Sequence, residues 1–147
     1  MIPPELIVME REHWVVNHRV GSIYPGYLMV ASRQRVSDIW ELNQESLAQL
    51  GPVLAEVERS VRLVYQPYKV LVCKLGFSKG FDCHFHVIPV HDWVLSEIAS
   101  HHYYSNEPDG NDVMLYINRE YCENQCLEKS SRIALNAAAE IKNILKP

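Results

Sequence analysis

The chain has 147 residues, of which 48% are hydrophobic and 22% are charged, and these values are typical of a globular protein with one sizeable core. Its formal net charge is −4. Proteins that bind extended nucleic acid usually carry a basic excess, so extended nucleic acid is not an expected partner, whereas a small phosphorylated ligand is compatible with this charge. No apolar run reaches the ~18 residues of a membrane span, and the first residues lack the basic and apolar regions of a signal peptide. We therefore expect a cytoplasmic protein with no membrane partner.

The first part of the chain is predicted to form β-strands. Short apolar runs between turn residues predict strands over residues 6–9, 13–18 and 27–31. Glycine, serine and proline within 21–26 predict the turn before the third strand. Apolar residues at helical spacing within 36–42 indicate a short helical turn after it.

The longest periodic segment predicts a helix over residues 43–65, in which leucine and valine recur every three or four positions. Asn43 is a suitable N-cap residue. The pair Gly51-Pro52 lies inside the pattern and predicts a kink or a restart, because proline lacks an amide hydrogen. Gln66-Pro67 is expected to end the helix.

Two further strands are predicted over residues 69–75 and 82–88. The polar turn at 77–80 joins them, and a short connection of this kind favours an antiparallel pair.

The rest of the chain has a weaker pattern. Pro108-Asp109-Gly110 predicts a turn, and the apolar run 113–117 predicts a strand after it. A final helix is expected to begin at Ser130 or Ser131. Together the elements predict one α+β domain over residues 1–147 with an antiparallel sheet.

Four cysteines, Cys73, Cys83, Cys122 and Cys126, are too few in a chain of this length for a disulfide framework, and they contain no Cys-x-x-Cys pair. We expect buried or partly buried thiols without a zinc site.

Candidate functional residues lie on the predicted strand 82–88. Successive side chains of a strand point to opposite faces, so Asp82, His84 and His86 share one face. The residues expected to face the core are Cys83, Phe85 and Val87.

This face is suited to phosphate chemistry. A neutral imidazole is a competent nucleophile towards phosphorus, and a second histidine is able to donate to the phosphate oxygens. The preceding turn adds the Ser78 hydroxyl, the charge of Lys79 and the backbone amides near Gly80. The residues alone leave two alternatives open. One is a purely structural His-x-His pair, and the other is a metal site on Asp82, His84 and His86.

The segment His84-Phe85-His86-Val87-Ile88-Pro89 resembles the signature of the histidine triad (HIT) family, His-φ-His-φ-His-φ-φ with φ apolar and often with proline after it. Upstream, Asn17-His18-Arg19 and Tyr24-Pro25-Gly26-Tyr27-Leu28-Met29-Val30 resemble the family's Asn-Arg and Pro-Gly-His segments. The resemblance covers about residues 6–90 and leaves 91–147 as a C-terminal extension with a final helix. It implies a HIT-like fold, a five-stranded antiparallel sheet with a long helix packed on it, and a homodimer.

The resemblance also implies roles for individual residues. His84 corresponds to the family's nucleophile and His86 to the histidine that assists at the phosphate. Asp82 stands where the family has its first histidine, Ser78 where it has a phosphate-contacting glutamine, and Tyr27 where it has the Pro-Gly-His histidine. We therefore expect His84, His86 and Asp82 to be catalytic. The expected substrate-binding residues are Ser78, Lys79, Gly80, Asn17 and Tyr27.

The implied function is hydrolysis or nucleotidyl transfer at the α-phosphate of a small nucleotide conjugate, such as a dinucleoside polyphosphate or a nucleoside phosphoramidate. It would proceed through a covalent nucleotidyl-histidine with no metal or other cofactor. The Asp82 carboxylate would oppose phosphate binding unless it is paired, or it would orient an imidazole. The alternative is a non-catalytic or weakly active nucleotide-binding protein.

Overall fold

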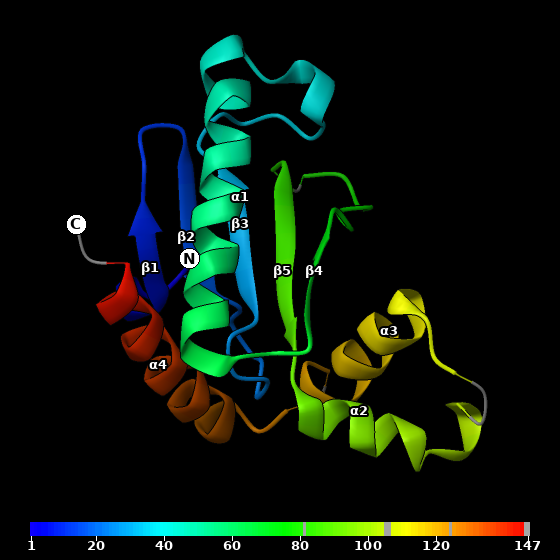
Figure 1. Cartoon of the computed structure of the whole chain (residues 1–147). Helices are drawn as coiled ribbons and strands as arrows, with labels where there is room; N and C mark the ends of the chain where they lie inside the picture. The colour runs from blue at the N-terminus through cyan, green and yellow to red at the C-terminus, as the bar shows by residue number, and fades with distance from the viewer. Residues whose placement is uncertain (81, 105–106, 124, 146–147) are drawn as a thin grey trace.

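The structure, a computed structural model, describes residues 1–80, 82–104, 107–123 and 125–145. Five strands form one sheet in the order β1-β2-β3-β5-β4, and every neighbouring pair is antiparallel (Figure 1). The strands are β1 (Ile7–Glu10), β2 (Trp14–His18), β3 (Leu28–Ser32), β4 (Lys69–Cys73) and β5 (His84–Val90). The five predicted strands and the expected antiparallel sheet are thus confirmed, with small shifts at the strand ends.

Helix α1 (Gln44–Tyr65) covers one face of the sheet, as the periodicity predicts (Figure 1). The Asn43 side chain accepts a hydrogen bond from the Ser46 amide at 2.8 Å and caps the helix. Gln66, with a φ of 48°, ends it in the left-handed conformation. The predicted restart at Gly51-Pro52 is wrong, because α1 runs through Pro52 without interruption. Tertiary packing explains this continuity, since Val53, directly after the proline, is buried against the sheet.

Helix α4 (Leu127–Ile144) lies beside α1 on the same face (Figure 1). Its predicted start at Ser130 or Ser131 is wrong, because the helix begins at Leu127 after Cys126. The periodicity of apolar residues shows that a helix is present more reliably than it shows at which residue the helix begins. The buried residues of α4 are mostly small: Ala134, Ala137, Ala138 and Ile141. Small side chains allow helices to approach closely, and this explains how α4 packs beside α1.

The predicted strand 113–117 is also wrong, because these residues lie in α3 (Gly110–Tyr121). A short apolar run fits a strand or a buried helix equally well. The Asp109 side chain accepts from the Asp112 amide, and the Asp112 side chain accepts from the Asp109 amide. This capping box starts a helix, and the turn predicted at 108–110 is its beginning.

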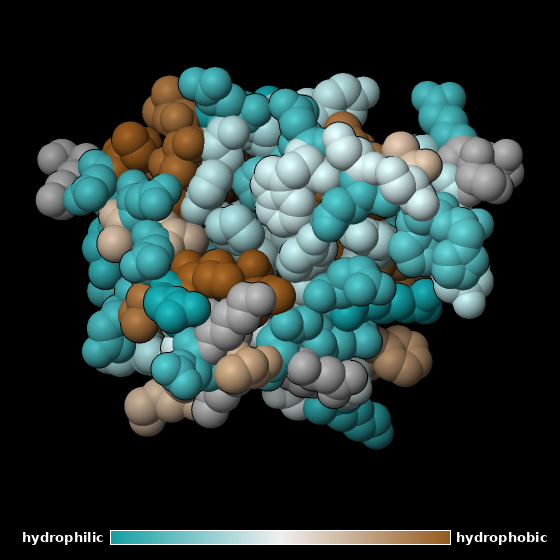
Figure 2. Space-filling view, turned by 90° about the horizontal axis from the view of Figure 1, so that it is seen from below, coloured by the Kyte–Doolittle hydropathy of each residue, from teal (hydrophilic) through white to brown (hydrophobic). Residues whose placement is uncertain are grey.

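Helices α2 (Asp92–Ala99) and α3 lie at one end of the sheet, at the bottom of Figure 1. They share a second hydrophobic cluster with the segment before β3 and the end of β5. Its buried members are Tyr24, Tyr27, Ile88, Val90, Val94, Ile98, Val113, Tyr116 and Ile117. Seen from below, hydrophilic and hydrophobic side chains are mixed over the surface (Figure 2). Short 3-10 turns complete the fold: η1 (Pro4–Leu6), η2 (Ile39–Glu41) and η3 (His102–Tyr104).

No helix in the described part of the chain is long and apolar enough to cross a membrane. Burial of the four thiols agrees with the sequence only in part. Cys83 is buried and Cys73 and Cys122 are partly buried, but Cys126, which precedes the first turn of α4, is exposed.

Candidate active site

The two motif histidines lie side by side on β5, on the face of the sheet opposite α1. In the antiparallel register His84 is opposite Ala31 and His86 is opposite Met29. The two imidazole rings have centroids 5.3 Å apart. His84 is half-buried, whereas His86 is only 7% exposed. The alternate residues Cys83, Phe85 and Val87 lie in the main core, as the strand periodicity predicts.

The His84 ring is oriented by the backbone of its own segment. Its Nδ1 atom lies 2.7 Å from the carbonyl oxygen of Asp82. A carbonyl oxygen only accepts hydrogen bonds, so Nδ1 carries the proton. In the neutral ring the lone pair is then on Nε2, and this is the nucleophilic nitrogen.

Asp82 contacts His84 through its backbone, and its side chain has a different neighbour. One carboxylate oxygen lies 4.0 Å from Arg35 Nε, and the Asp82 side chain is 44% exposed. The orientation of His84 therefore does not require a particular side chain at position 82. The nearby guanidinium partly offsets the negative charge that Asp82 brings to this edge of the site.

His86 is held by side chains from other elements. Its Nδ1 lies 2.7 Å from the Tyr27 hydroxyl, which lies 3.2 Å from Asn118 Oδ1. Arg19 also donates a hydrogen bond to Asn118 Oδ1, and its guanidinium lies 4.8 Å from the centre of the Tyr27 ring. Burial, with smaller contributions from His84 and Arg19, lowers the pKa of His86 to about 4, so the ring is neutral at pH 7. Burial also raises the pKa of Tyr27 to about 12, so its hydroxyl remains protonated.

Three hollows meet at His84. The first, which we call the His86 hollow, has a volume of about 400 Å³ and contains both histidines. Its other lining residues are Arg19, Met29, Leu75, Gly76, Phe77, Ser78 and Asn118. The second, the apolar hollow, has a volume of about 270 Å³. It is lined by Ile2, Asn17, Arg19, Val20, Met29, Ala31, Asp82 and His84.

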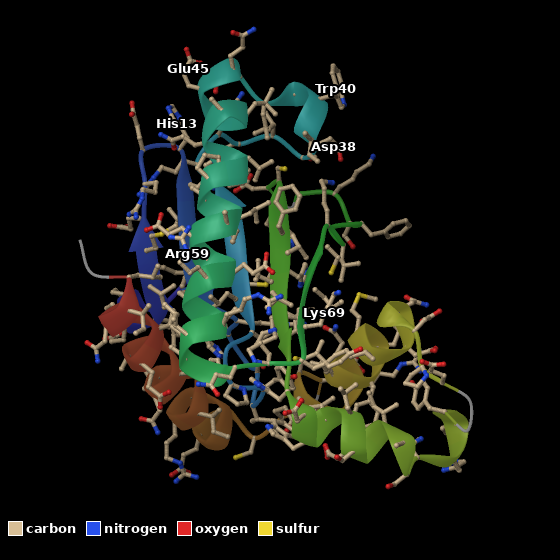
Figure 3. All side chains as sticks on the ribbon, in the orientation of Figure 1. His13, Asp38, Trp40, Glu45, Arg59 and Lys69 are labelled. Carbon is tan, nitrogen blue, oxygen red and sulfur yellow. The ribbon has the colours of Figure 1, made fainter. Side chains whose placement is uncertain are left out.

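The third, the polar hollow, has a volume of about 240 Å³ and lies on the side of His84 towards the loop between β4 and β5. It is lined by Ser37, Asp38, Lys74, Gly76, Phe77, Ser78, Lys79, Asp82 and His84. Lys74 Nζ lies 2.9 Å from an Asp38 carboxylate oxygen. Figure 3 shows Asp38 at the top of the sheet, near this loop, whereas Trp40 points away into solvent. The hollow therefore contains side chains of both charges next to the His84 ring.

The predicted site residues fall into two groups. Ser78, Lys79 and Asn17 line the hollows, together with Asp82 and the two histidines. Two predicted residues are not among the described residues that line them. Gly80 lies in the preceding turn with a φ of 91°, a conformation that favours glycine. Tyr27 is fully buried behind His86.

The residues at the site that were not predicted from the sequence include Arg19, Gly76 and Asn118. Gly76 approaches His84 so closely that a Cβ atom there would lie 3.2 Å from the ring's Cε1. Asn118 comes from α3, in the segment whose helix was not recognised. Arg19 lies within the segment that resembles the HIT family, and this proximity in sequence was its only signal.

A metal site on Asp82, His84 and His86 was one alternative open at the level of sequence. Among the residues that the structure describes, no three histidine, cysteine, aspartate or glutamate side chains are grouped as ligands of a metal ion would be. The His86 Nδ1 atom is instead occupied by the Tyr27 hydroxyl.

The HIT domain family matches residues 3–92, most of the chain, and the protein belongs to this family. Solved structures with the same fold include a HIT-like protein involved in cell-cycle regulation from Bartonella henselae. It is 14% identical, with a TM-score of 0.64 over 97% of this chain and 88% of that one. A comparison with curated proteins gives no match.

Two further structures carry informative names. A hypothetical histidine triad nucleotide-binding protein from Sulfolobus tokodaii is 17% identical, with a TM-score of 0.60 over 95% of this chain and 85% of that one. The diadenosine triphosphate hydrolase of Plasmodium falciparum is 9% identical, with a TM-score of 0.61 over 99% of this chain and 82% of that one. At these identities the likeness establishes the fold.

Proposed function

We propose that this protein hydrolyses a nucleotide conjugate, or transfers its nucleotidyl group, by attack of His84 on the α-phosphate. The observation that carries the proposal is the 2.7 Å contact between His84 Nδ1 and the Asp82 carbonyl oxygen. This contact leaves the lone pair of the neutral ring on Nε2, where it is able to attack phosphorus. The ring borders all three hollows, so a substrate that spans them would bring its phosphate to this nitrogen.

The chemical character of the hollows suggests how the substrate lies. The apolar hollow, with Ile2, Val20 and Met29, suits a base and its sugar, and Asn17 adds a polar group there. The α-phosphate would then lie between His84 and His86. The polar hollow would receive the leaving group, where Lys79 and the Ser78 hydroxyl are able to contact phosphate oxygens.

The reaction would proceed in two steps. In the first, a bond forms between His84 Nε2 and the α-phosphorus while the bond to the leaving oxygen or nitrogen breaks. The leaving group takes that electron pair, and a leaving nitrogen also takes a proton from solvent. The Asp82 carbonyl continues to accept from Nδ1–H and stabilises the positive ring of the nucleotidyl-histidine. In the second step water attacks phosphorus, the phosphorus–nitrogen bond breaks, the electron pair returns to Nε2, and the proton that the water loses ends in solvent. An acceptor other than water would make the protein a transferase.

The named relatives support this choice of substrate class. One solved structure with this fold is a diadenosine triphosphate hydrolase and another is described as nucleotide-binding. The second candidate is a nucleotide-binding protein with little or no turnover. The observation that favours it is the Asp82 carboxylate beside His84 in two of the three hollows.

A panel of adenylyl and guanylyl conjugates with an α-phosphate label tests the proposal. Acid-labile, base-stable label should be trapped on the wild-type protein and not on His84→Ala. His102→Ala, which removes an exposed histidine in η3, is the matched control and should behave as wild type. Binding of the conjugates without turnover of any of them would favour the second candidate. Normal turnover by His84→Ala would refute the assignment of the nucleophile.

Three further expectations remain predictions. The chemistry uses no metal, so treatment with a chelator should leave turnover unchanged. The homodimer should appear in light scattering coupled to size-exclusion chromatography. The cytoplasmic location should appear on fractionation of cells that make the protein.

A further inference from the structure

The contacts of Asn118 determine where its side-chain oxygen points. Asn118 Nδ2 donates a hydrogen bond to the Met114 carbonyl oxygen, one turn earlier in α3, at 2.9 Å. The other end of the amide, Oδ1, therefore faces Arg19 and Tyr27. Arg19 has only donors, so the oxygen is the end of the amide that this position requires.

The direction of the next hydrogen bond follows from this orientation. Asn118 Oδ1 has no proton, and it lies 3.2 Å from the Tyr27 hydroxyl oxygen. The contact is attractive only if Tyr27 donates, because otherwise two oxygen atoms would face each other with no hydrogen between them. Tyr27 has a single hydroxyl hydrogen, and this contact uses it.

The hydroxyl oxygen of Tyr27 then acts as an acceptor for His86. Its oxygen lies 2.7 Å from His86 Nδ1, and with its own hydrogen directed to Asn118 it receives a hydrogen from that nitrogen. The neutral His86 ring is therefore protonated on Nδ1 and has its lone pair on Nε2. This is the reverse of the tautomer that a neutral histidine needs in order to donate to a phosphate from Nε2.

We propose that Asn118, acting through Tyr27, is a positioning residue that holds the His86 proton on Nδ1, so that Nε2 presents a lone pair to the site. His86 then takes up a proton at Nε2 and does not act as a fixed donor. In the reaction proposed above, on which this second part rests, the proton would come from the water that attacks the nucleotidyl-histidine. As the oxygen–phosphorus bond forms, the water's proton moves to His86 Nε2, and it returns to solvent after the nucleoside monophosphate leaves.

The proposed positioning residue, Asn118, lies outside the part of the chain that matches the HIT family. Residues 3–92 supply His86 and Tyr27, whereas Asn118 comes from α3. Asn118 is half-buried and lines the same hollow as both histidines. Helix α3 thus contributes a wall of the hollow and the acceptor that ends the hydrogen-bond chain.

Nitrogen NMR of the histidine rings at pH 7 tests the tautomer directly, without any substrate. His86, assigned by comparison with His86→Gln, should show its proton on Nδ1 in the wild-type protein. In Asn118→Leu the Tyr27 hydroxyl loses its acceptor and should turn to donate to His86 Nδ1. The ring proton of His86 should therefore move from Nδ1 to Nε2. Asn118→Asp keeps an oxygen in place and should retain the wild-type tautomer. Asn111→Leu, at an exposed position of α3, is the matched control and should leave the spectrum of His86 unchanged.

A proton on Nε2 in the wild-type protein would overturn the proposal, and so would an unchanged tautomer in a folded Asn118→Leu. If Asn118→Leu does not fold, Tyr27→Phe and the wild-type spectrum still decide the matter, because removal of the hydroxyl should abolish the Nδ1 preference. Turnover gives the second test. Asn118→Leu should slow release of trapped label by about tenfold or more while label still forms. The spectra are independent of turnover, so an inactive protein with the expected tautomer would refute the proposed function and leave the assignment of Asn118 intact.

Discussion

At the His84 end of the site the ring is oriented by a backbone carbonyl two residues earlier in the same segment. At the His86 end the ring is oriented by Tyr27, which precedes β3, and by Asn118 on α3. The first arrangement depends on local chain geometry and tolerates different side chains at position 82. The second depends on tertiary packing and on the exact donors and acceptors of three side chains. We therefore expect the two histidines of one motif to respond differently to substitution.

The largest contrast is expected between the two alanine variants. His84→Ala should lower turnover by ~10³-fold or more and abolish the trapped label, because it removes the atom that bonds to phosphorus. His86→Ala should lower turnover by about 10²-fold and still accumulate label, because a proton acceptor contributes less than the nucleophile. Rapid quench in alkaline denaturant, which preserves the base-stable label, followed by counting of protein-bound label measures both. Loss of label in His86→Ala with label retained in His84→Ala would reverse the assignment.

Stability should fall in acid because two buried histidines, His86 at the site and His18 in β2, resist protonation in the folded chain. Burial lowers the pKa values of His86 and His18 from 6.5 to about 4 each. Between about pH 6.5 and pH 4 the unfolded chain binds protons that the folded chain does not, so the free energy of unfolding falls as the pH falls through this window. Each group contributes on the order of 3 kcal/mol over the full window.

Urea unfolding at several pH values between 7 and 4 measures this dependence. His86→Gln should flatten the curve of unfolding free energy against pH, and His18→Gln should flatten it by a similar amount. His18 has a structural role, since its Nε2 accepts a hydrogen bond from the Gly26 amide at 3.0 Å. Curves that stay parallel to the wild-type curve in both variants would contradict the prediction.

A smaller effect is expected from a substitution at Gly76, which tests how exactly the His84 ring must be placed for turnover. A methyl group at this position would lie 3.2 Å from His84 Cε1 and displace the ring by a few tenths of an ångström. Gly76→Ala should therefore lower the turnover number by about tenfold, since small misplacements of reacting groups are costly. Gly51→Ala is the matched control, because nothing lies within 4 Å of the added atom. That change lies inside α1 and should stabilise the protein by roughly 0.5–1 kcal/mol with unchanged activity. Equal activity of the two variants would show that the ring has room to move.

These differences also explain what the sequence predicts and what it does not. The five strands, α1 and the shared face of His84 and His86 follow from local periodicity and turn residues, and the structure confirms them. The strand predicted at 113–117 fails because a five-residue apolar run has no period of its own, and the Asp109–Asp112 capping box was the missed signal. With α3 unrecognised, Asn118 had no predicted position near His86. Contacts between distant segments depend on packing that no local pattern encodes.

The smallest expected effect concerns Asp82 and completes the comparison, because it separates the backbone of this residue from its side chain. The contact with His84 uses the carbonyl oxygen, so Asp82→His and Asp82→Asn should leave the turnover number within about twofold of wild type. The carboxylate should weaken phosphate binding by like-charge repulsion. Because the side chain is 44% exposed and lies 4.0 Å from Arg35 Nε, this repulsion should amount to no more than about 1 kcal/mol. Asp82→His should therefore lower KM for nucleotide conjugates by up to about fivefold, and Asp82→Asn should lower it less.

Arg35→Ala provides the matched test of this electrostatic explanation. Removal of the guanidinium leaves the carboxylate uncompensated, so KM should rise in the wild-type background. The same change should have a smaller effect in the Asp82→Asn background, where there is no charge to offset, and the difference between the two backgrounds measures the coupling of the pair. Steady-state measurement of both kinetic parameters for the four proteins decides the matter. A fall in turnover number with an unchanged KM in Asp82→Asn would instead mean that the carboxylate, and not the carbonyl, keeps the His84 imidazole in its working orientation.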